Sequence, residues 1–67
     1  MITYNRLWKK LIDLNLKKSE LSKMSGVSMT SIEKLKHNEY VNTVILNRFC
    51  AALNCDISEI MEYVSDK

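Results

Sequence analysis

The chain has 67 residues, with one Gly, no Pro, two Cys, 46% hydrophobic residues and a formal net charge of +2. A chain of this length forms at most one small domain, with a stability of roughly 3 to 10 kcal/mol, and cannot build the multilayered core of a large enzyme. The scarcity of Gly and Pro argues against tight hairpins and proline-rich linkers and favours helices joined by short turns.

The sequence has the features of a soluble, cytoplasmic protein. It contains no run of about 20 apolar residues that could span a membrane. Residues 1–16 lack the basic start, apolar stretch and small-residue cleavage site of a signal peptide. Cys50 and Cys55 form no CxxC pair, and free thiols suit a reducing compartment.

The residue types offer no catalytic or metal-binding constellation. His37 is the single histidine, and its spacing from Cys50 and Cys55 matches no zinc module. No nucleophile with a base in register and no working pair of carboxylates is present. We therefore expect no enzymatic activity, no metal, no cofactor and no small-molecule ligand.

The positive charge is concentrated in the first half of the chain. Residues 1–36 contain eight Lys or Arg and three Asp or Glu, which gives +5, whereas residues 37–67 contain two and five, which gives −3. Such an asymmetry is typical of a basic binding face joined to an acidic remainder.

The first predicted helix carries an apolar stripe at the spacing i, i+3, i+4, i+7, i+8. Its members are Tyr4, Leu7, Trp8, Leu11 and Ile12. We interpret the whole stripe, including the indole, as core. We expect Asn15 to end the helix in a left-handed conformation and Leu16 to pack back onto the core.

A second helix of two turns is predicted for residues 18–25, with Leu21 and Met24 as its apolar contacts. Gly26, the single glycine, follows at once and is suited to a tight left-handed turn. Val27 then becomes a buried residue at the hinge.

The third predicted helix begins after Ser28, whose hydroxyl can accept from a free backbone N–H. Ile32 and Leu35 form its inward stripe, and it ends at about His37, with Asn38 as the C-terminal cap.

Two more helices are predicted, which makes five helices and a single all-α domain over residues 1–67. Asn42 or Thr43 caps the fourth helix, and Asp56 and Glu59 have the spacing of a capping box that opens the fifth. The inward positions are Leu46, Phe49, Cys50 and Leu53 in the fourth helix and Ile57, Ile60, Met61 and Val64 in the fifth.

The two helices around Gly26 resemble the helix-turn-helix of the lambda repressor and Cro-like family, of the xenobiotic-response-element type. The matching positions are Leu21, Ser25-Gly26-Val27-Ser28, Ile32 and Leu35. Residues 49–54 and 57–60 resemble the fourth and fifth helices of that family. Residues 36–40 and 52–57 resemble its small stand-alone regulators from Gram-positive bacteria and mobile elements.

The resemblance extends over residues 4–63 and implies a compact five-helix fold whose third helix enters the DNA major groove. The sequence departs from the family pattern at four positions. Lys18 and Met29 replace the Gln that often starts each motif helix, and Asn38 and Asn54 replace glycines after the third and fourth helices. Asn tolerates the same backbone region as those glycines at a higher cost.

Lys17 and Lys18 lie at a predicted helix N-terminus, where the helix dipole disfavours cations by about 0.3 to 1 kcal/mol. A bound phosphate would reverse that penalty, so this position predicts phosphate contacts. The resemblance places five residues of the third helix and its cap at DNA-facing positions, and His37 follows one turn later. The full predicted DNA-binding set is Lys17, Lys18, Ser28, Met29, Thr30, Glu33, Lys34, His37 and Asn38.

The sequence thus predicts a transcriptional repressor that binds double-stranded DNA at a palindromic operator as a homodimer. Ile45, Tyr63 and Val64 are the predicted dimer surface, because they are apolar beyond what so small a core needs. The alternative is a protein-interaction module of the same fold, such as an antitoxin-like or anti-repressor adaptor. Met29 and Glu33, at DNA-facing positions of the third helix, favour this alternative.

Overall fold

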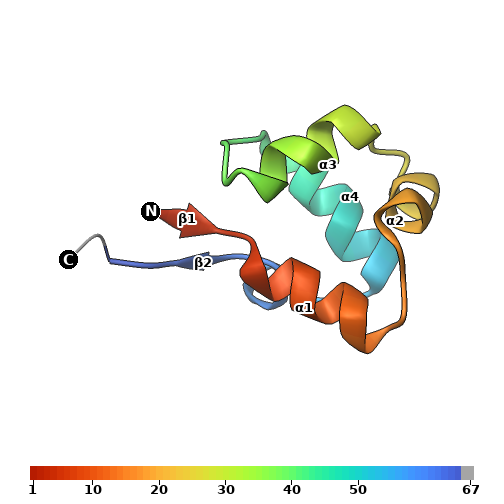
Figure 1. The fold of residues 1–67 in the computed structure, drawn as a ribbon, viewed down its shortest axis with the longest axis horizontal. Helices are drawn as coiled ribbons and strands as arrows, with labels where there is room; N and C mark the ends of the chain where they lie inside the picture. Colours follow the sequence, from red (N-terminus) through yellow and green to blue (C-terminus); the bar gives the residue numbers. More distant parts are fainter. Residues whose placement is uncertain (66–67) are drawn as a thin grey trace.

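The computed structural model describes residues 1–65 and is mainly helical (Figure 1). In chain order the elements are β1 (Ile2–Thr3), α1 (Asn5–Asp13), α2 (Lys18–Ser25), α3 (Met29–Lys36), α4 (Thr43–Leu53), the 3-10 turn η1 (Ile57–Glu59) and β2 (Glu62–Tyr63). The last two residues of the expected domain, 66–67, lie outside the described residues. Within residues 1–65, no helix is both long and apolar enough to cross a bilayer.

Side-chain caps set the starts of α3 and α4. The Ser28 hydroxyl accepts a hydrogen bond from the backbone N–H of Ser31 at 3.3 Å, and Asn42 Oδ1 accepts one from the backbone N–H of Ile45 at 3.1 Å. Both bonds satisfy donors that the first turn of a helix leaves free. Of the two candidates for the cap of α4, Asn42 takes the role, because Thr43 is already helical.

Left-handed residues follow the four α-helices. Gly26 ends α2 with φ 74°, and Asn15, Asn38 and Asn54 have φ values of 56°, 56° and 51° after α1, α3 and α4. Asn adopts this region more readily than other side chains because its short polar group can hydrogen-bond locally. The turn predicted at the glycine and the left-handed asparagines are confirmed.

One apolar core joins the helices to the segment that follows η1. Its buried hydrophobic residues are Tyr4, Leu7, Leu11, Leu21, Val27, Ile32, Leu35, Leu46, Phe49 and Ile60. Trp8, Leu16, Cys50 and Leu53 are half-buried and pack against this cluster. Most of the inward positions predicted from helical spacing are therefore correct.

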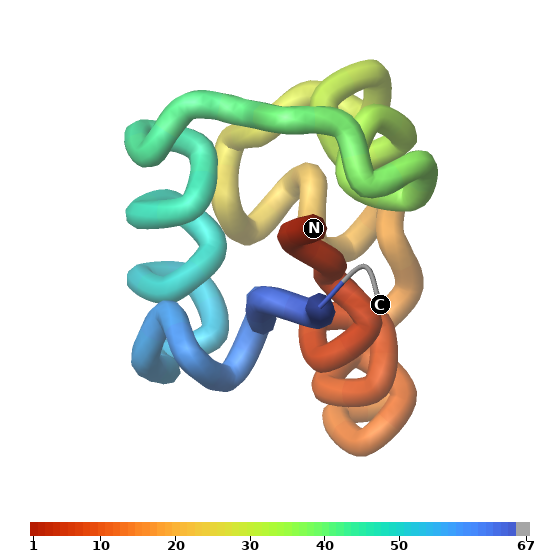
Figure 2. The backbone as a smooth tube through the Cα atoms, turned by 90° about the vertical axis from the view of Figure 1, so that its left-hand side faces the viewer, coloured from red at the N-terminus to blue at the C-terminus, as the bar shows by residue number. Residues whose placement is uncertain are grey.

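The prediction of five helices is wrong. The fifth segment is only the 3-10 turn η1, and the chain then extends as β2, which pairs antiparallel with β1 in the register Ile2↔Tyr63 and Thr3↔Glu62. The capping box at Asp56 forms, but one short turn already brings Ile60 into the core. The strands β1 and β2, from the two ends of the described chain, satisfy each other's backbone groups. They lie side by side (Figures 1 and 2).

Four apolar residues assigned to inward stripes lie at the surface instead. Ile12 is 77% exposed, Met24 50%, Val64 42% and Ile57 41%. The helices are short, so one or two side chains fill the inner face of each, as Leu21 does for α2. Apolar side chains at the edge of each stripe are therefore left exposed to solvent.

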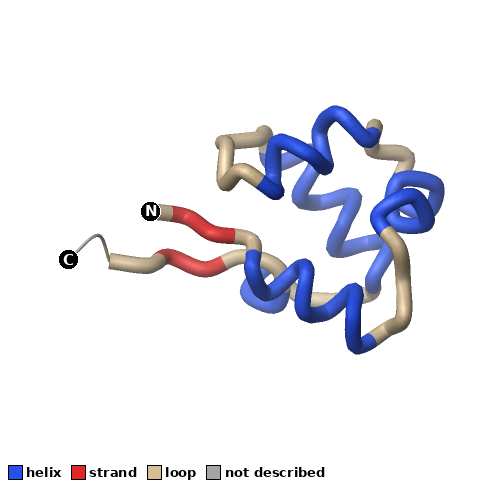
Figure 3. The backbone as a smooth tube through the Cα atoms, in the orientation of Figure 1, coloured by secondary structure: helices blue, strands red, loops and turns tan. Residues whose placement is uncertain are grey.

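A short loop connects α2 and α3 (Figure 3). Hydrogen bonds hold this loop in place. Ser22 Oγ donates to the backbone carbonyl of Val27 at 2.6 Å, and Ser25 Oγ donates to that of Leu21 at 2.7 Å. Arg48, from α4, donates to the carbonyl of Gly26 at 3.4 Å. Because α4 also packs against α2, it supports the turn both through Arg48 and through the helix that precedes the turn.

Candidate nucleic-acid interface

The outer face of α3 carries polar and apolar side chains that the core does not use. Ile32 and Leu35 anchor the helix from below with no exposed surface. The exposed residues of the predicted reading face are Met29, Thr30, Glu33 and Lys34. They lie within two turns of one another, so a groove that admits a helix would meet all four.

The residues at the two ends of α3 have structural duties as well. Ser28 is the N-cap, and its hydroxyl also donates to Ser31 Oγ at 3.3 Å. His37 is exposed at the C-cap, whereas Asn38 is half-buried in the left-handed conformation. In the sequence, all three flank the helix that carries the reading face.

The start of α2 differs in one respect from the sequence expectation. Lys17 is the N-cap residue, and its backbone N–H donates to Glu20 Oε1 at 3.0 Å. The Glu20 carboxylate therefore already offsets part of the unfavourable charge at this helix end. The Lys17 side chain is exposed, whereas Lys18 is half-buried with its Nζ 5.2 Å from the centroid of the Trp8 ring.

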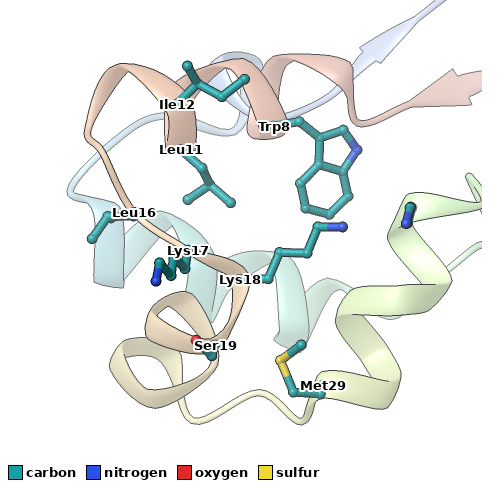
Figure 4. A pocket seen from close by; sticks show the side chains of 9 residues that line it. Trp8, Leu11, Ile12, Leu16, Lys17, Lys18, Ser19 and Met29 are labelled. Atoms are coloured by element: carbon teal, nitrogen blue, oxygen red, sulfur yellow. The ribbon is translucent and has the colours of Figure 1, made fainter.

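A groove of about 650 Å³ runs between α1, the start of α2 and α3, and we call it the α1–α3 groove (Figure 4). It is lined by Trp8, Leu11, Ile12, Leu16, Lys17, Lys18, Ser19, Met29 and Lys36. Three of these residues are lysines and none is acidic. The floor is apolar, and the groove continues into the reading face through the side chain of Met29.

Only some of the cations in the basic first half of the sequence form ion pairs in the folded chain. Arg6 forms an ion pair with Glu62 at 3.1 Å, and Lys10 forms one with Glu59 at 3.1 Å. The hydrogen bond that the Lys10 ammonium donates to the Glu59 carboxylate raises the pKa of Lys10. Within residues 1–65, the cations of the first half that form no ion pair are Lys9, Lys17, Lys18, Lys23, Lys34 and Lys36. The net +5 is therefore only partly available to a partner.

Three residues near this surface were not predicted to take part in it. Lys36 follows Met29 by two helical turns on the same side of α3, a spacing that could have identified it. Arg48 contacts the Gly26 carbonyl from α4, and Trp8 contacts Lys18 from α1. Those two contacts join elements far apart in sequence and leave no local signal.

The two cysteines lie away from these contacts, at the end of α4 and just after it. Both are free thiols, and burial, followed by the neighbouring Cys50, raises the pKa of Cys55. The part of the chain that the structure describes contains no cluster of three or more His, Cys, Asp or Glu that could hold a metal.

Two helices joined by a left-handed glycine, with an exposed second helix beside unpaired lysines, define a helix-turn-helix protein. Residues 6–66 match the Cro/C1-type HTH DNA-binding domain, and the chain belongs to that family. It is also similar to the solved structure of the transcriptional regulator VanUg, with a TM-score of 0.90 and 43% identity over 97% of this chain and 87% of that one. A comparison with curated proteins found no match.

Proposed function

We propose that the protein is a sequence-specific transcriptional regulator, a repressor, that places α3 in the major groove of a palindromic operator. The exposed face of α3, held rigidly on a buried stripe within a Cro/C1-type domain, carries this proposal. The regulatory role draws support from the similarity to VanUg, a transcriptional regulator. The proposal of repression rests on steric exclusion: a protein bound at an operator blocks access to that stretch of DNA.

The exposed side chains of α3 can contact different groups on the edges of the DNA bases. Lys34 is suited to guanine O6 and N7, Glu33 to the cytosine amine, and the methyl groups of Thr30 and Met29 to the thymine methyl. Of the remaining predicted DNA-binding residues, Lys17, Lys18 and Ser28 are suited to backbone phosphates, and His37 and Asn38 follow the reading face at the end of α3. Phosphate contacts orient the domain on the duplex and carry no sequence information of their own.

The reading of a palindrome requires two copies. One recognition helix covers about half a turn of DNA, and a two-fold pair places two such helices roughly 34 Å apart. Tyr63 and Val64, in and just after β2, are exposed, whereas Ile45 is half-buried on α4 and packs against the core. We propose these three residues as the contact between the copies.

Selection of bound DNA from a random pool tests this function. We expect the recovered sequences to contain an inverted repeat. Lys34→Ala should change which bases are selected, whereas Lys18→Ala should weaken binding to all sequences alike. Lys9→Ala is the matched control, because it removes one lysine charge from a residue that lines a different groove of α1. An unchanged preference after Lys34→Ala contradicts the assignment of α3.

Salt dependence tests the electrostatic part. With about four phosphate contacts in each of two copies, log K should fall against log salt with a slope of about −7. Fluorescence anisotropy of a labelled duplex at several salt concentrations measures that slope. A slope near zero contradicts binding through phosphate contacts.

A protein-interaction module is the second candidate. Met29 is 41% exposed and Glu33 lies beside it, and both suit a protein surface as well as DNA. Retention on heparin and on bulk DNA at low salt discriminates the two functions. A protein that passes through both columns while capturing a protein partner through α3 is an adaptor.

A further inference from the structure

The α1–α3 groove is lined by both apolar and cationic side chains, and of these only Met29 belongs to the reading face. Its floor includes Trp8 and Leu11, and its lysines come from the start of α2 and the end of α3. Deoxyribose offers apolar surface and each linking phosphate carries one negative charge. A DNA strand therefore matches both parts of this lining.

The position of Lys18 inside the groove is fixed by an aromatic contact. Its Nζ lies 5.2 Å from the centroid of the Trp8 ring, within the range at which an ammonium is attracted to a ring face. Figure 4 shows the lysine extending across the groove beneath the indole, toward α3. Within residues 1–65 no carboxylate pairs with Lys18, so the ring is its partner.

We propose that Trp8 is a positioning residue for DNA binding, which holds the Lys18 ammonium in the α1–α3 groove, where Lys18 and Lys36 bind phosphates of one DNA strand. This inference rests on the proposed function. A free lysine side chain loses rotamer freedom when it contacts a phosphate. An ammonium that the ring already holds loses less, so the contact forms at a lower entropic cost.

A double-mutant cycle measures this coupling. Trp8→Leu keeps an apolar side chain but removes the ring face, and it should weaken binding of a short mixed-sequence duplex at low salt by about two- to five-fold. In a Lys18→Ala background the same substitution should have no effect on affinity. Trp8→Phe keeps a ring and should bind more tightly than Trp8→Leu.

Ile12→Ala is the matched control, because Ile12 lines the same groove without a described contact to the ammonium. Its effect on affinity should be equal in the two backgrounds. A Trp8→Leu effect that is also equal in the two backgrounds shows a merely structural role and overturns the inference.

The fluorescence of Trp8, the sole tryptophan of the chain, gives a second readout that does not depend on how well the leucine variant folds. We expect Lys18→Ala to change the emission of the DNA-free protein, and duplex to change the emission of the wild type. Binding by anisotropy without any change in emission overturns the inference alone. A wild type that does not bind duplex at low salt overturns the proposed function and this inference together.

Discussion

At Gly26 the helix-turn-helix depends on backbone conformation and not on space for a side chain. The φ of 74° lies in the left-handed region, and among residues 1–65 a Cβ placed there would meet only Arg48 Nη1, at an ordinary 3.7 Å. A residue that carries a Cβ, other than Asn or Asp, is strained in this region by about 1 to 2 kcal/mol. The cost of a substitution here is therefore conformational.

We expect Gly26→Ala to lower the free energy of unfolding by about 1 to 2 kcal/mol, measured by urea denaturation. Gly26→Val should cost more and unfold the domain or abolish binding, because a β-branched residue is a stronger outlier at positive φ. Gly26→Asn is the control and should cost less than Gly26→Ala, as the chain already places Asn at three such positions. Equal stability of the Ala variant and the wild type contradicts the turn assignment.

Thr3 has a buried hydroxyl that forms no hydrogen bond within residues 1–65. The residue is 6% exposed, and its Oγ1 has no hydrogen-bond partner among the described residues. We expect Thr3→Val, which has nearly the same shape, to raise the free energy of unfolding by about 1 kcal/mol. Thr3→Ser keeps the hydroxyl and loses the methyl, so it should lower stability. A less stable valine variant in the same urea titration contradicts this argument.

At the scale of elements, Glu59 joins η1 to α1. One carboxylate oxygen accepts from the backbone N–H of Asp56 at 2.8 Å, and the other accepts from Lys10 Nζ at 3.1 Å. The backbone hydrogen bond, followed by Lys10, lowers the pKa of Glu59. A carboxyl group of this kind stabilises the fold above its unfolded pKa of about 4.3, and this contribution is lost as the pH falls through its folded pKa.

We therefore expect Glu59→Gln to melt at a lower temperature than the wild type near neutral pH, and the difference to shrink below about pH 4. The amide oxygen can still accept the backbone hydrogen bond, so the substitution isolates the charge. Thermal melts followed by circular dichroism across this range measure the difference. Glu39→Gln, at an exposed acid outside the two ion pairs that join α1 to the C-terminal segment, should show little change. A difference that does not vary with pH contradicts a role for the charge.

Local sequence signals set most of the element boundaries. Ser28 and Asn42 cap the helices that follow them, and Gly26 forms the left-handed turn after α2. Each signal acts within about four residues, so it can be read without knowing the fold. The capping box predicted at Asp56 is present, but a capping box does not determine the length of the helix that follows it. Tertiary packing of Ile60 and pairing of β2 with β1 decide that length.

At the scale of the whole molecule, the pairing of β1 with β2 places both strands at one end of the domain (Figure 1), and Tyr63 of β2 and the following Val64 are exposed. Tyr63 is 72% exposed, so its side chain contributes little to the folded monomer. If it lies between two copies, Tyr63→Glu should shift the protein toward monomer without loss of fold. Sedimentation at several protein concentrations measures this shift.

Ile12→Glu is the matched control for that experiment, because Ile12 is as exposed and lies at the far end of α1 from β1. It should leave the oligomeric state unchanged. A wild type that sediments as a monomer up to high micromolar concentrations contradicts assembly before DNA binding.

The sequence by itself determined the helix-turn-helix, because its signals are local: an apolar stripe, a cap, a single glycine and the spacing between them. It also identified the exposed residues of α3, since those left over from the stripe Ile32 and Leu35 must face outward. Only the tertiary structure decided which cations pair with acids, how the termini close, and that Trp8 and Lys18 meet. These contacts join different elements across the fold, and their geometry depends on how the helices pack, which no local pattern encodes.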